Sequence, residues 1–368
     1  MPTRTVRTAK KQSKSAPKRA ERVAKSGKKS SRRKRLSGNT KRILGLLLLF
    51  TLSGGFLLGL GVYKNLTKNF ASASSGGDYF ISERDIFSLL YVSVEDFNKE
   101  PFLATNIQMS LIDKNNNKVV SYSVPLNLTV DVPGKFGEEE INKVFALGNL
   151  NNREDLKSGI SLLDNTVTSI FGLKVDKYII VDSNLRTELD GFFEKGTLGM
   201  TVSLNNLSRF QDSMITDLTF NEFMGIYFFV SSLPQDRFIR KSFEPVYIED
   251  PSILDDEIKD LTFDSSLSLE KKSIAVLNGA GIPGLAQYGS RLVQNLGGRV
   301  VGVGNASQVY TESFLVVDES DLVTTSALVH SFGIKNILLK ENAAFIKENE
   351  MDRADVVVIM GLDIKDVL

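Results

Sequence analysis

Residues 43–63 read ILGLLLLFTLSGGFLLGLGVY and contain no charged side chain. Twenty-one residues at the rise of an α-helix span about 31 Å, close to the roughly 30 Å of hydrocarbon in a bilayer. A helix of a water-soluble domain would carry a polar stripe, and this stretch has none. We therefore predict a single transmembrane helix, with the segments on its two sides in different compartments.

The segment before this stretch is strongly basic, and the segment after it is acidic. Residues 1–42 hold 17 Lys and Arg and one acid, Glu21, whereas the rest of the chain holds 28 Lys and Arg and 43 Asp and Glu. Because Lys and Arg mark the cytoplasmic flank of a membrane span, the N-terminus is predicted to be cytoplasmic. Residues 64–368 are expected outside the cell, held at the cell membrane by one span.

Residues 1–42 are rich in Lys, Arg, Ser and Ala and are predicted to be a disordered tail. Beside a span, the simplest partner of such a tail is the anionic inner leaflet, worth about 1 kcal/mol per basic residue near the surface. Basic tails also bind nucleic acid through its phosphates. We favour membrane lipid as the partner of the anchor and the tail, and do not expect nucleic acid.

A cleaved signal peptide is the alternative to a retained anchor. Residues 71–73, Ala-Ser-Ala, have the form of a cleavage site, but the apolar run exceeds the usual length of roughly 7–15 residues and ends well before them. Residues 64–78 instead resemble a polar linker that ends in Ser and Gly. A retained anchor is favoured.

The chain has no cysteine and a single histidine, His330. This composition excludes thiol catalysis, cysteine-ligated metals and metal sites built from several histidines. His330 lies at the edge of the apolar face of a predicted helix, 322–333, where a structural role is expected. We predict no metal site and no cofactor.

Residues 79–244 alternate between strand-like and helix-like patterns. Strands are predicted at 87–94, 106–113, 118–132 and 175–182. Helical spacing is found at 138–148, 154–172 and 183–193. This alternation predicts an α/β sandwich as the first exported domain.

The acidic residues 245–272 are predicted to be an irregular linker. After it, residues 273–368 show a β-α-β-β-α-β-β pattern that predicts a smaller α/β domain. The expected fold class is therefore α/β, with a transmembrane helix followed by an α/β sandwich and a smaller C-terminal domain.

Four landmarks of the first domain occur in an order known from one protein family. They are SVPLNLTVDVPG at 123–134, EINKVFALG at 140–148, IFGLKVDKYIIVD at 170–182 and LDGFF at 189–193. This order resembles the LytR–CpsA–Psr proteins of bacterial cell envelopes. The resemblance implies an extracellular domain that moves glycopolymer from a polyprenyl-pyrophosphate carrier to peptidoglycan, with cell-wall polymer and polyprenyl-linked glycan as partners.

The chain departs from this family at the site itself. The family motif Ser-Ile-Pro-Arg-Asp-Thr uses the arginine to hold pyrophosphate, and here Leu126 and Asn127 replace Arg and Asp. A guanidinium binds phosphate oxygens with two hydrogen bonds, whereas leucine has no donor. The family also holds magnesium with acids after its first strand and ahead of its second. In this chain Glu95 or Asp96 corresponds to the first of these acids, and residues 102–108 contain no acid that corresponds to the second.

We therefore predict a pseudoenzyme with no catalytic residues. It would be a non-catalytic scaffold or binding protein for wall glycopolymer or envelope partners. The alternative is an active phosphotransferase that attaches glycopolymer to peptidoglycan with Mg²⁺, through ligands that the sequence does not reveal.

The last segment closely resembles the LytR C-terminal domain. The residues that carry this resemblance are 276–279, 281, 283–286, 302–305 and 357–363. The loop 278–284 also contains the pattern G-x-G-x-x-G, but the following strand ends without the acid that a dinucleotide site requires. We predict instead a tight turn whose helix N-terminus meets an anionic or hydroxylated ligand. The candidate binding residues are Asn278, Gly279, Gly281, Gly284, Asn305, Gly361 and Asp363.

Overall fold

A computed structural model describes residues 85–150, 156–186, 213–262, 265–320 and 322–367, together with Leu189 and eight residues between Leu60 and Ala71. The predicted tail, nearly all of the predicted span and much of the predicted linker at 64–78 lie outside the described residues. Among those described, no helix combines the length and the apolar character needed to cross a bilayer. Residues 59–368 form one compact unit.

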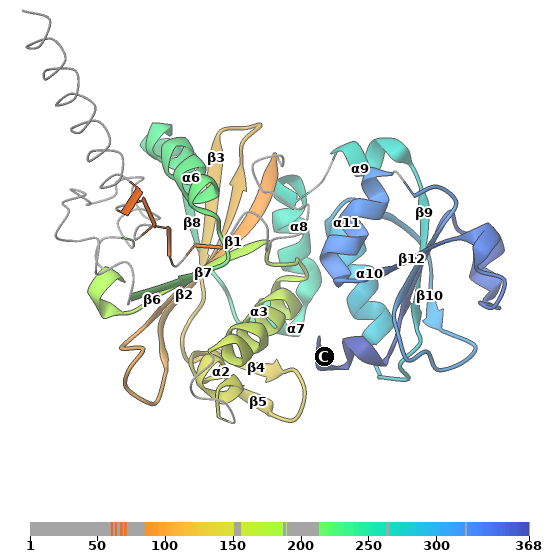
Figure 1. Cartoon of the computed structure of the whole chain (residues 1–368), viewed down its shortest axis with the longest axis horizontal. Helices are drawn as coiled ribbons and strands as arrows, with labels where there is room; N and C mark the ends of the chain where they lie inside the picture. The colour runs from red at the N-terminus through yellow and green to blue at the C-terminus, as the bar shows by residue number, and fades with distance from the viewer. Residues whose placement is uncertain are drawn as a thin grey trace, which may run out of the picture. The chain divides into compact units, whose positions relative to one another are not determined.

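The first sheet is mixed and has the strand order β7-β6-β1-β2-β3-β8 (Figure 1). Its strands are β1 (Ile86–Val94), β2 (Ala104–Asp113), β3 (Lys118–Ser123), β6 (Lys177–Val181), β7 (Met214–Thr216) and β8 (Phe238–Ser242). β1, β2 and β3 pair antiparallel, while β6 runs parallel to β1 and β8 parallel to β3. Nearly every residue of β1 is buried, because helices cover both faces of the sheet.

Helices form the outer two of three layers. Those on one face of the sheet are α2 (Ile141–Gly148), α3 (Lys157–Phe171) and α8 (Pro251–Thr262), and α6 (Phe220–Ser232) packs on the other. Alternate residues of β1 point to different layers, so that Leu90 faces α3 and Leu89 faces α6. This arrangement confirms the α/β class for this part of the chain.

The strand predicted at 118–132 is interrupted, so its predicted length is wrong. β3 ends at Ser123, and a separate strand β4 (Thr129–Val132) pairs antiparallel with β5 (Gly137–Glu140). Pro125 has no N–H to donate to a ladder, which explains the interruption between β3 and β4. The helix predicted from residue 138 begins only with α2, because the glutamates of β5 pair with β4.

The prediction that residues 245–272 are irregular is also wrong. They form α7 (Val246–Glu249), α8 and α9 (Ser265–Glu270). In α8, Leu254, Ile258 and Leu261 recur at helical spacing and are buried in the core of the first sheet. Acidic side chains on the other faces of α8 dominate its composition and conceal this apolar stripe. The domain boundaries themselves stay a prediction.

The second sheet has five strands in the order β10-β9-β13-β11-β12. Its elements are β9 (Ser273–Asn278), α10 (Leu285–Asn295), β10 (Arg299–Asn305), β11 (Phe314–Val317), α11 (Val323–Phe332), β12 (Asn336–Leu339) and β13 (Val356–Met360). The predicted order of strands and helices is confirmed. All pairs are parallel except β11 with β13. Short 3-10 helices complete the described chain: η3 (Gln235–Arg237), η4 (Lys340–Asn342), η5 (Asn349–Asp352) and η6 (Leu362–Val367).

Candidate functional site

Leu126 and Asn127 lie in the loop between β3 and β4. The Leu126 side chain is partly buried and packs against the core on the α3 face, while Asn127 is exposed. The loop is fixed at the start of α2, where the N–H of Asn142 donates to the Leu126 carbonyl over 3.3 Å. Position 126 thus contributes to the apolar core instead of offering a donor to phosphate.

Asp96, one of the two acids compared with the family's magnesium ligands, is used in a local turn. Its Oδ1 accepts hydrogen bonds from the backbone N–H of Asn98 at 2.8 Å and from the side-chain amide of Asn98 at 3.3 Å. Glu95 has an exposed side chain. Within the part of the chain that the structure describes, no three acidic or histidine side chains are grouped as metal ligands would be.

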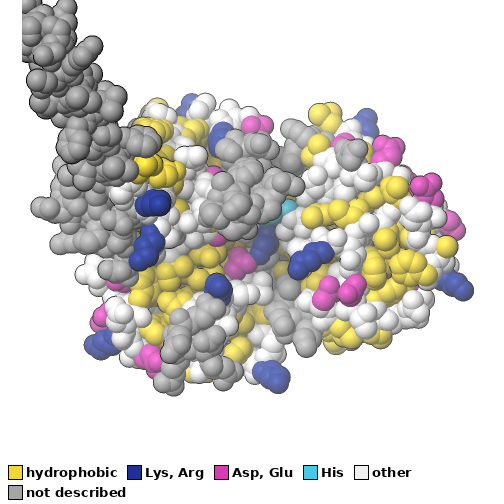
Figure 2. All heavy atoms as spheres, viewed as in Figure 1, with side chains coloured by type: hydrophobic (Ala, Val, Ile, Leu, Met, Phe, Trp, Pro, Cys, Tyr) yellow, Lys and Arg dark blue, Asp and Glu magenta, His cyan; other side chains and the backbone are white. Residues whose placement is uncertain are grey.

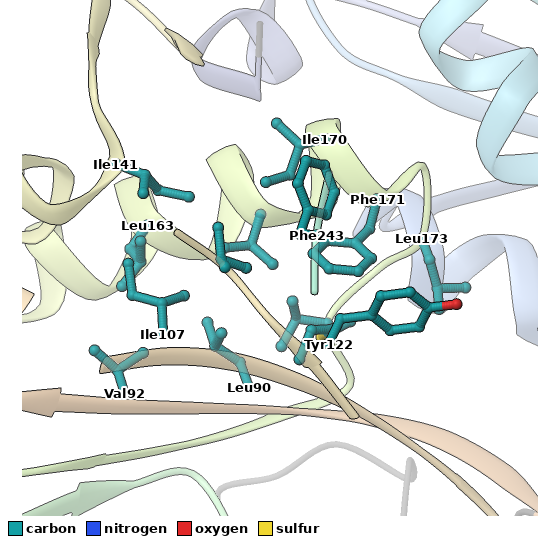
Figure 3. Packing of buried hydrophobic residues seen from close by; sticks show 14 of the residues in the cluster. Leu90, Val92, Ile107, Tyr122, Ile141, Leu163, Ile170, Phe171, Leu173 and Phe243 are labelled. Atoms are coloured by element: carbon teal, nitrogen blue, oxygen red, sulfur yellow. The ribbon is translucent and has the colours of Figure 1, made fainter. Parts of the chain in front are cut away.

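An aromatic cluster occupies the space between β3, α3 and the segment after β8 (Figure 3). The ring centroids of Tyr122 and Phe171 are 5.7 Å apart, those of Phe171 and Phe243 5.1 Å, and those of Phe243 and Tyr247 5.2 Å. All four side chains are buried. The chain's own rings therefore fill this part of the α3 face.

Glu257 on α8 satisfies the polar ends of this cluster. Its carboxylate accepts hydrogen bonds from the Tyr247 hydroxyl at 2.8 Å, the Lys241 Nζ at 2.6 Å and the Tyr122 hydroxyl at 3.4 Å. The hydrogen bond from Lys241 is the main cause that lowers the pKa of Glu257. Burial, assisted by Glu257, raises the pKa of Tyr247 to about 12. These hydrogen bonds fasten α8 to the sheet. The shifts in pKa keep Glu257 ionised and the two tyrosines neutral.

The glycine loop of the second sheet is held by Asn278. The Asn278 Oδ1 accepts hydrogen bonds from three successive backbone N–H groups, those of Ala280, Gly281 and Ile282, at 3.2, 2.9 and 3.3 Å. Its amide donates to the Ile282 carbonyl at 2.7 Å and to Asn305 Oδ1 at 3.2 Å. These N–H groups are therefore already paired, which leaves them unavailable to a dinucleotide phosphate.

Three of the predicted glycines have structural reasons to be glycine. Gly281 and Gly284 adopt φ angles of +70° and +83°, in the left-handed region. At Gly279 a Cβ would lie 3.0 Å from the Tyr310 ring. The tight turn predicted for this loop is confirmed.

Asp363 and Gly361 fasten the loop 306–313. Asp363 accepts hydrogen bonds from the Ser313 hydroxyl at 2.6 Å and from the Ser313 N–H at 3.1 Å, and the N–H of Gly361 donates to the Ser313 hydroxyl at 2.8 Å. The N–H of Tyr310, in the same loop, donates to the Gly279 carbonyl at 2.8 Å.

The seven candidate binding residues thus gather at one edge of the second sheet. They lie at or just beyond the carboxyl ends of the parallel strands β9, β10 and β13, the edge at which open α/β sheets bind ligands. The side chains of Asn278 and Asp363 bond mainly to the protein's own loops. A role in ligand binding stays a prediction.

Sequence reasoning missed the polar contact between the two sheets. Arg291 on α10 donates from its two terminal nitrogens to the carbonyls of Ser169 at 2.8 Å and Ile170 at 3.2 Å, at the end of α3. Its Nε bonds both carboxylate oxygens of Asp255 on α8, at 3.0 and 2.9 Å. Asn295 donates to the Gly172 carbonyl at 2.8 Å. Carbonyls left over at a helix C-terminus and the negative end of its dipole both favour such donors.

His330 takes part in the same contact. Its Nε2 lies 2.9 Å from Asp176 Oδ1, and the other oxygen of Asp176 accepts a hydrogen bond from the N–H of Ser88 at 2.7 Å. Nearby, Lys174 forms an ion pair with Asp164. Burial raises the pKa of Asp164, and this effect is larger than the lowering caused by the charge and the hydrogen bond of Lys174. The arrangement supports the structural role expected for His330.

Comparison with known proteins gives only structural neighbours. No family model and no curated protein matches the chain. The chain is similar to the solved structure of Bacillus subtilis TagV, with 12% identity, 44% of this chain and 85% of that chain covered, and a TM-score of 0.35. B. subtilis TagT is 14% identical, with 52% of this chain and 96% of that chain covered and a TM-score of 0.33. TagT bound to LIIa-WTA is 13% identical, with 52% of this chain and 98% of that chain covered and a TM-score of 0.35. The resemblance to the LytR–CpsA–Psr family rests on the sequence landmarks at 123–134, 140–148, 170–182 and 189–193.

Proposed function

We propose that this protein is a membrane-anchored cell-envelope protein that binds polyprenyl-linked glycan or wall glycopolymer without catalysing its transfer. The observation that carries the proposal is the packing of Leu126 against the core, where a family enzyme places the arginine that holds pyrophosphate. Loss of one such contact costs roughly a hundred- to a thousandfold in rate, by analogy with oxyanion donors. Asn127 removes the neighbouring acid as well.

Two further features support a scaffold. Asp96 is bonded to Asn98 in a turn, and the aromatic cluster around Phe171 fills part of the α3 face with the chain's own side chains. Arg291 then fastens the second sheet's helix to α3. TagT has been solved bound to LI-WTA and to LIIa-WTA. A polyprenyl-linked glycan is accordingly the ligand class to test first.

The proposed location is the cell membrane, with the N-terminus in the cytoplasm and residues 64–368 outside. The charge-free stretch 43–63 and the basic excess of residues 1–42 support this topology. Protease added to intact cells should degrade residues 64–368 and spare the tail. Protection of the large domain would contradict the topology.

The catalytic question is tested with the purified full-length protein in detergent. Incubated with a polyprenyl-pyrophosphate-linked glycan and peptidoglycan, it should bind the lipid-linked glycan and give no transfer or hydrolysis, with or without Mg²⁺. The double change Leu126→Arg with Asn127→Asp should tighten pyrophosphate binding slightly and still give no turnover. Leu269→Arg, at an exposed leucine of α9, controls for the addition of an arginine away from this loop.

Two outcomes would contradict the proposal. Robust transfer by the unmodified protein would favour the active phosphotransferase. Absence of binding to any lipid-linked glycan, with the protein folded, would leave the envelope partners as the remaining ligands and remove the glycan from the proposal.

A further inference from the structure

The first described residues of the chain lie against the N-terminal end of α6. The Tyr63 and Phe220 ring centroids are 6.2 Å apart, and the Phe70 ring lies 5.5 Å from Phe220 and 5.4 Å from Phe223. The N–H of Ala71 donates to the Leu218 carbonyl at 2.8 Å. Tyr63 is the last residue of the predicted span. The start of α6 is therefore fixed beside the point where the predicted anchor ends.

One side of α6 is buried, and the outward side carries one strongly exposed ring, Phe228. Phe223, Ile226 and Val230 pack on the first sheet. Phe220 and Met224 are half-buried, Met224 against the same core, whereas 64% of Phe228 is exposed. Hydrophobic side chains gather at the upper left of Figure 2, where α6 lies in Figure 1.

The only charged residue in the α6 sequence does not reach this outward side. Glu222 is buried and closes a capping box, in which its carboxylate accepts from the Thr219 N–H at 2.8 Å. Its other oxygen lies 3.8 Å from the Nζ of Lys177. The outward face of α6, defined here by its exposed residues Asn221, Gly225, Phe228, Ser231 and Ser232, is consequently uncharged.

We propose that this outward face of α6 lies in the headgroup region of the bilayer that holds the anchor. The inference rests on the proposed membrane anchorage. If residue 63 ends the span, its contact with Phe220 brings the start of α6 to the lipid surface. Exposed aromatic side chains such as Phe228 favour that interface.

This placement has a consequence for the rest of the domain. α2, α3 and the loop with Leu126 pack on the face of the first sheet opposite to α6. Docking through α6 therefore turns that opposite face away from the bilayer, toward the wall polymer.

The absence of cysteine allows a single label to be placed anywhere in the full-length protein. Phe228→Cys, labelled with an environment-sensitive fluorophore, is compared with Phe345→Cys, whose native ring is 56% exposed and contacts Phe314 in the second sheet. Both variants are reconstituted in phosphatidylcholine–phosphatidylglycerol vesicles. The label at 228 should be quenched by lipid-borne nitroxide, shift its emission to the blue and escape quenching by iodide. The label at 345 should be quenched by iodide alone.

Flotation with the vesicles separates this inference from the proposed function. If the protein floats but the label at 228 behaves as the label at 345 does, the docking of α6 is wrong while the anchor stands. If the protein does not float, the anchor fails and the docking of α6 fails with it. Quenching between labelled copies, relieved by unlabelled protein and unaffected by lipid nitroxide, would show that a second copy covers this face, and would equally overturn the inference. A cooperative melt of each variant before labelling verifies that it is folded.

Discussion

Around the first sheet, partly buried polar side chains join segments far apart in the chain, whereas the side chain that holds the glycine loop of the second sheet acts mainly over short distances. Glu257 bonds Tyr122, which is 135 residues away, and Arg291 bonds Ser169, 122 residues away. The Asn278 Oδ1 instead bonds groups two to four residues ahead, and its amide reaches Asn305, 27 residues away. The first sheet thus depends on helices that follow it in the chain, while the glycine loop is closed by its own residues.

The strongest test of this difference concerns α8. Ile258 is fully buried beneath the first sheet, so Ile258→Ala should lower the free energy of unfolding by about 2–5 kcal/mol. Ile253→Ala, on the exposed side of the same helix, is the matched control and should have a much smaller effect. Urea unfolding of the full-length protein followed by circular dichroism measures both. Equal, small losses would show that α8 is only a linker.

A smaller loss is expected from the contact at the end of α3. Arg291→Ala leaves Asp255 and two helix-terminal carbonyls without their guanidinium partner, which should cost about 2–3 kcal/mol of unfolding free energy. Lys143→Ala removes a cation whose ion pairs with Glu139 and Glu140 are exposed, and it should change little. Unfolding curves that cannot tell the two variants apart would mean that Arg291 does not hold the two sheets together.

Asp217 should make the stability of the folded protein depend on pH. Burial raises its pKa to about 6, while the hydrogen bond from the Tyr178 N–H and the charge of Lys177 oppose the rise. An aspartate in an unfolded chain titrates near pH 3.9, so the folded state holds the extra proton between about pH 4 and 6. Stability should therefore fall as pH rises through this window, by about 1–2 kcal/mol.

The variant Asp217→Asn tests this assignment. It removes the titration, should flatten the pH profile between about 4 and 6, and should raise stability at neutral pH. The exposed Asp131→Asn should leave the profile of the unmodified protein in place. A slope that survives in Asp217→Asn would assign the pH dependence to another group.

The smallest expected difference in stability is between glycine substitutions at two helix ends that have the same backbone geometry. Gly172 after α3 and Gly333 after α11 have φ angles of +60° and +63°. Alanine at either position should cost about 1 kcal/mol from the left-handed conformation alone. At 172 the added Cβ would also collide with the Arg291 guanidinium and the Asn295 amide, whereas at 333 it meets nothing.

The expected result is therefore a larger loss for Gly172→Ala than for Gly333→Ala, measured as a difference in unfolding free energy. In the Arg291→Ala background this difference should shrink, because one of the two colliding groups is gone. A difference that is unchanged there would trace the extra cost to the backbone of α3.

Local patterns in the sequence determined part of the first domain and the element order of the second, whereas β7, β8, α6 and α8 were not predicted. The largely apolar run of β1, the β2–β3 hairpin and the β-α-β-β-α-β-β order could be predicted because spacing and turn chemistry are properties of neighbouring residues. The sequence likewise showed Leu126 and Asn127 at the places where the family that it resembles has Arg and Asp.

Only the tertiary structure decided which side chains meet. The apolar stripe of α8 was concealed by acidic residues, and its role depends on packing against β1 and β2, more than a hundred residues earlier. Nothing near Arg291 in the sequence indicates that it caps α3. The sequence also allowed Asn278 to serve a ligand, and the fold assigned its oxygen to the N–H groups of its own loop. The physical reason is that hydrogen-bond partners are fixed by distance in space, which local spacing does not encode.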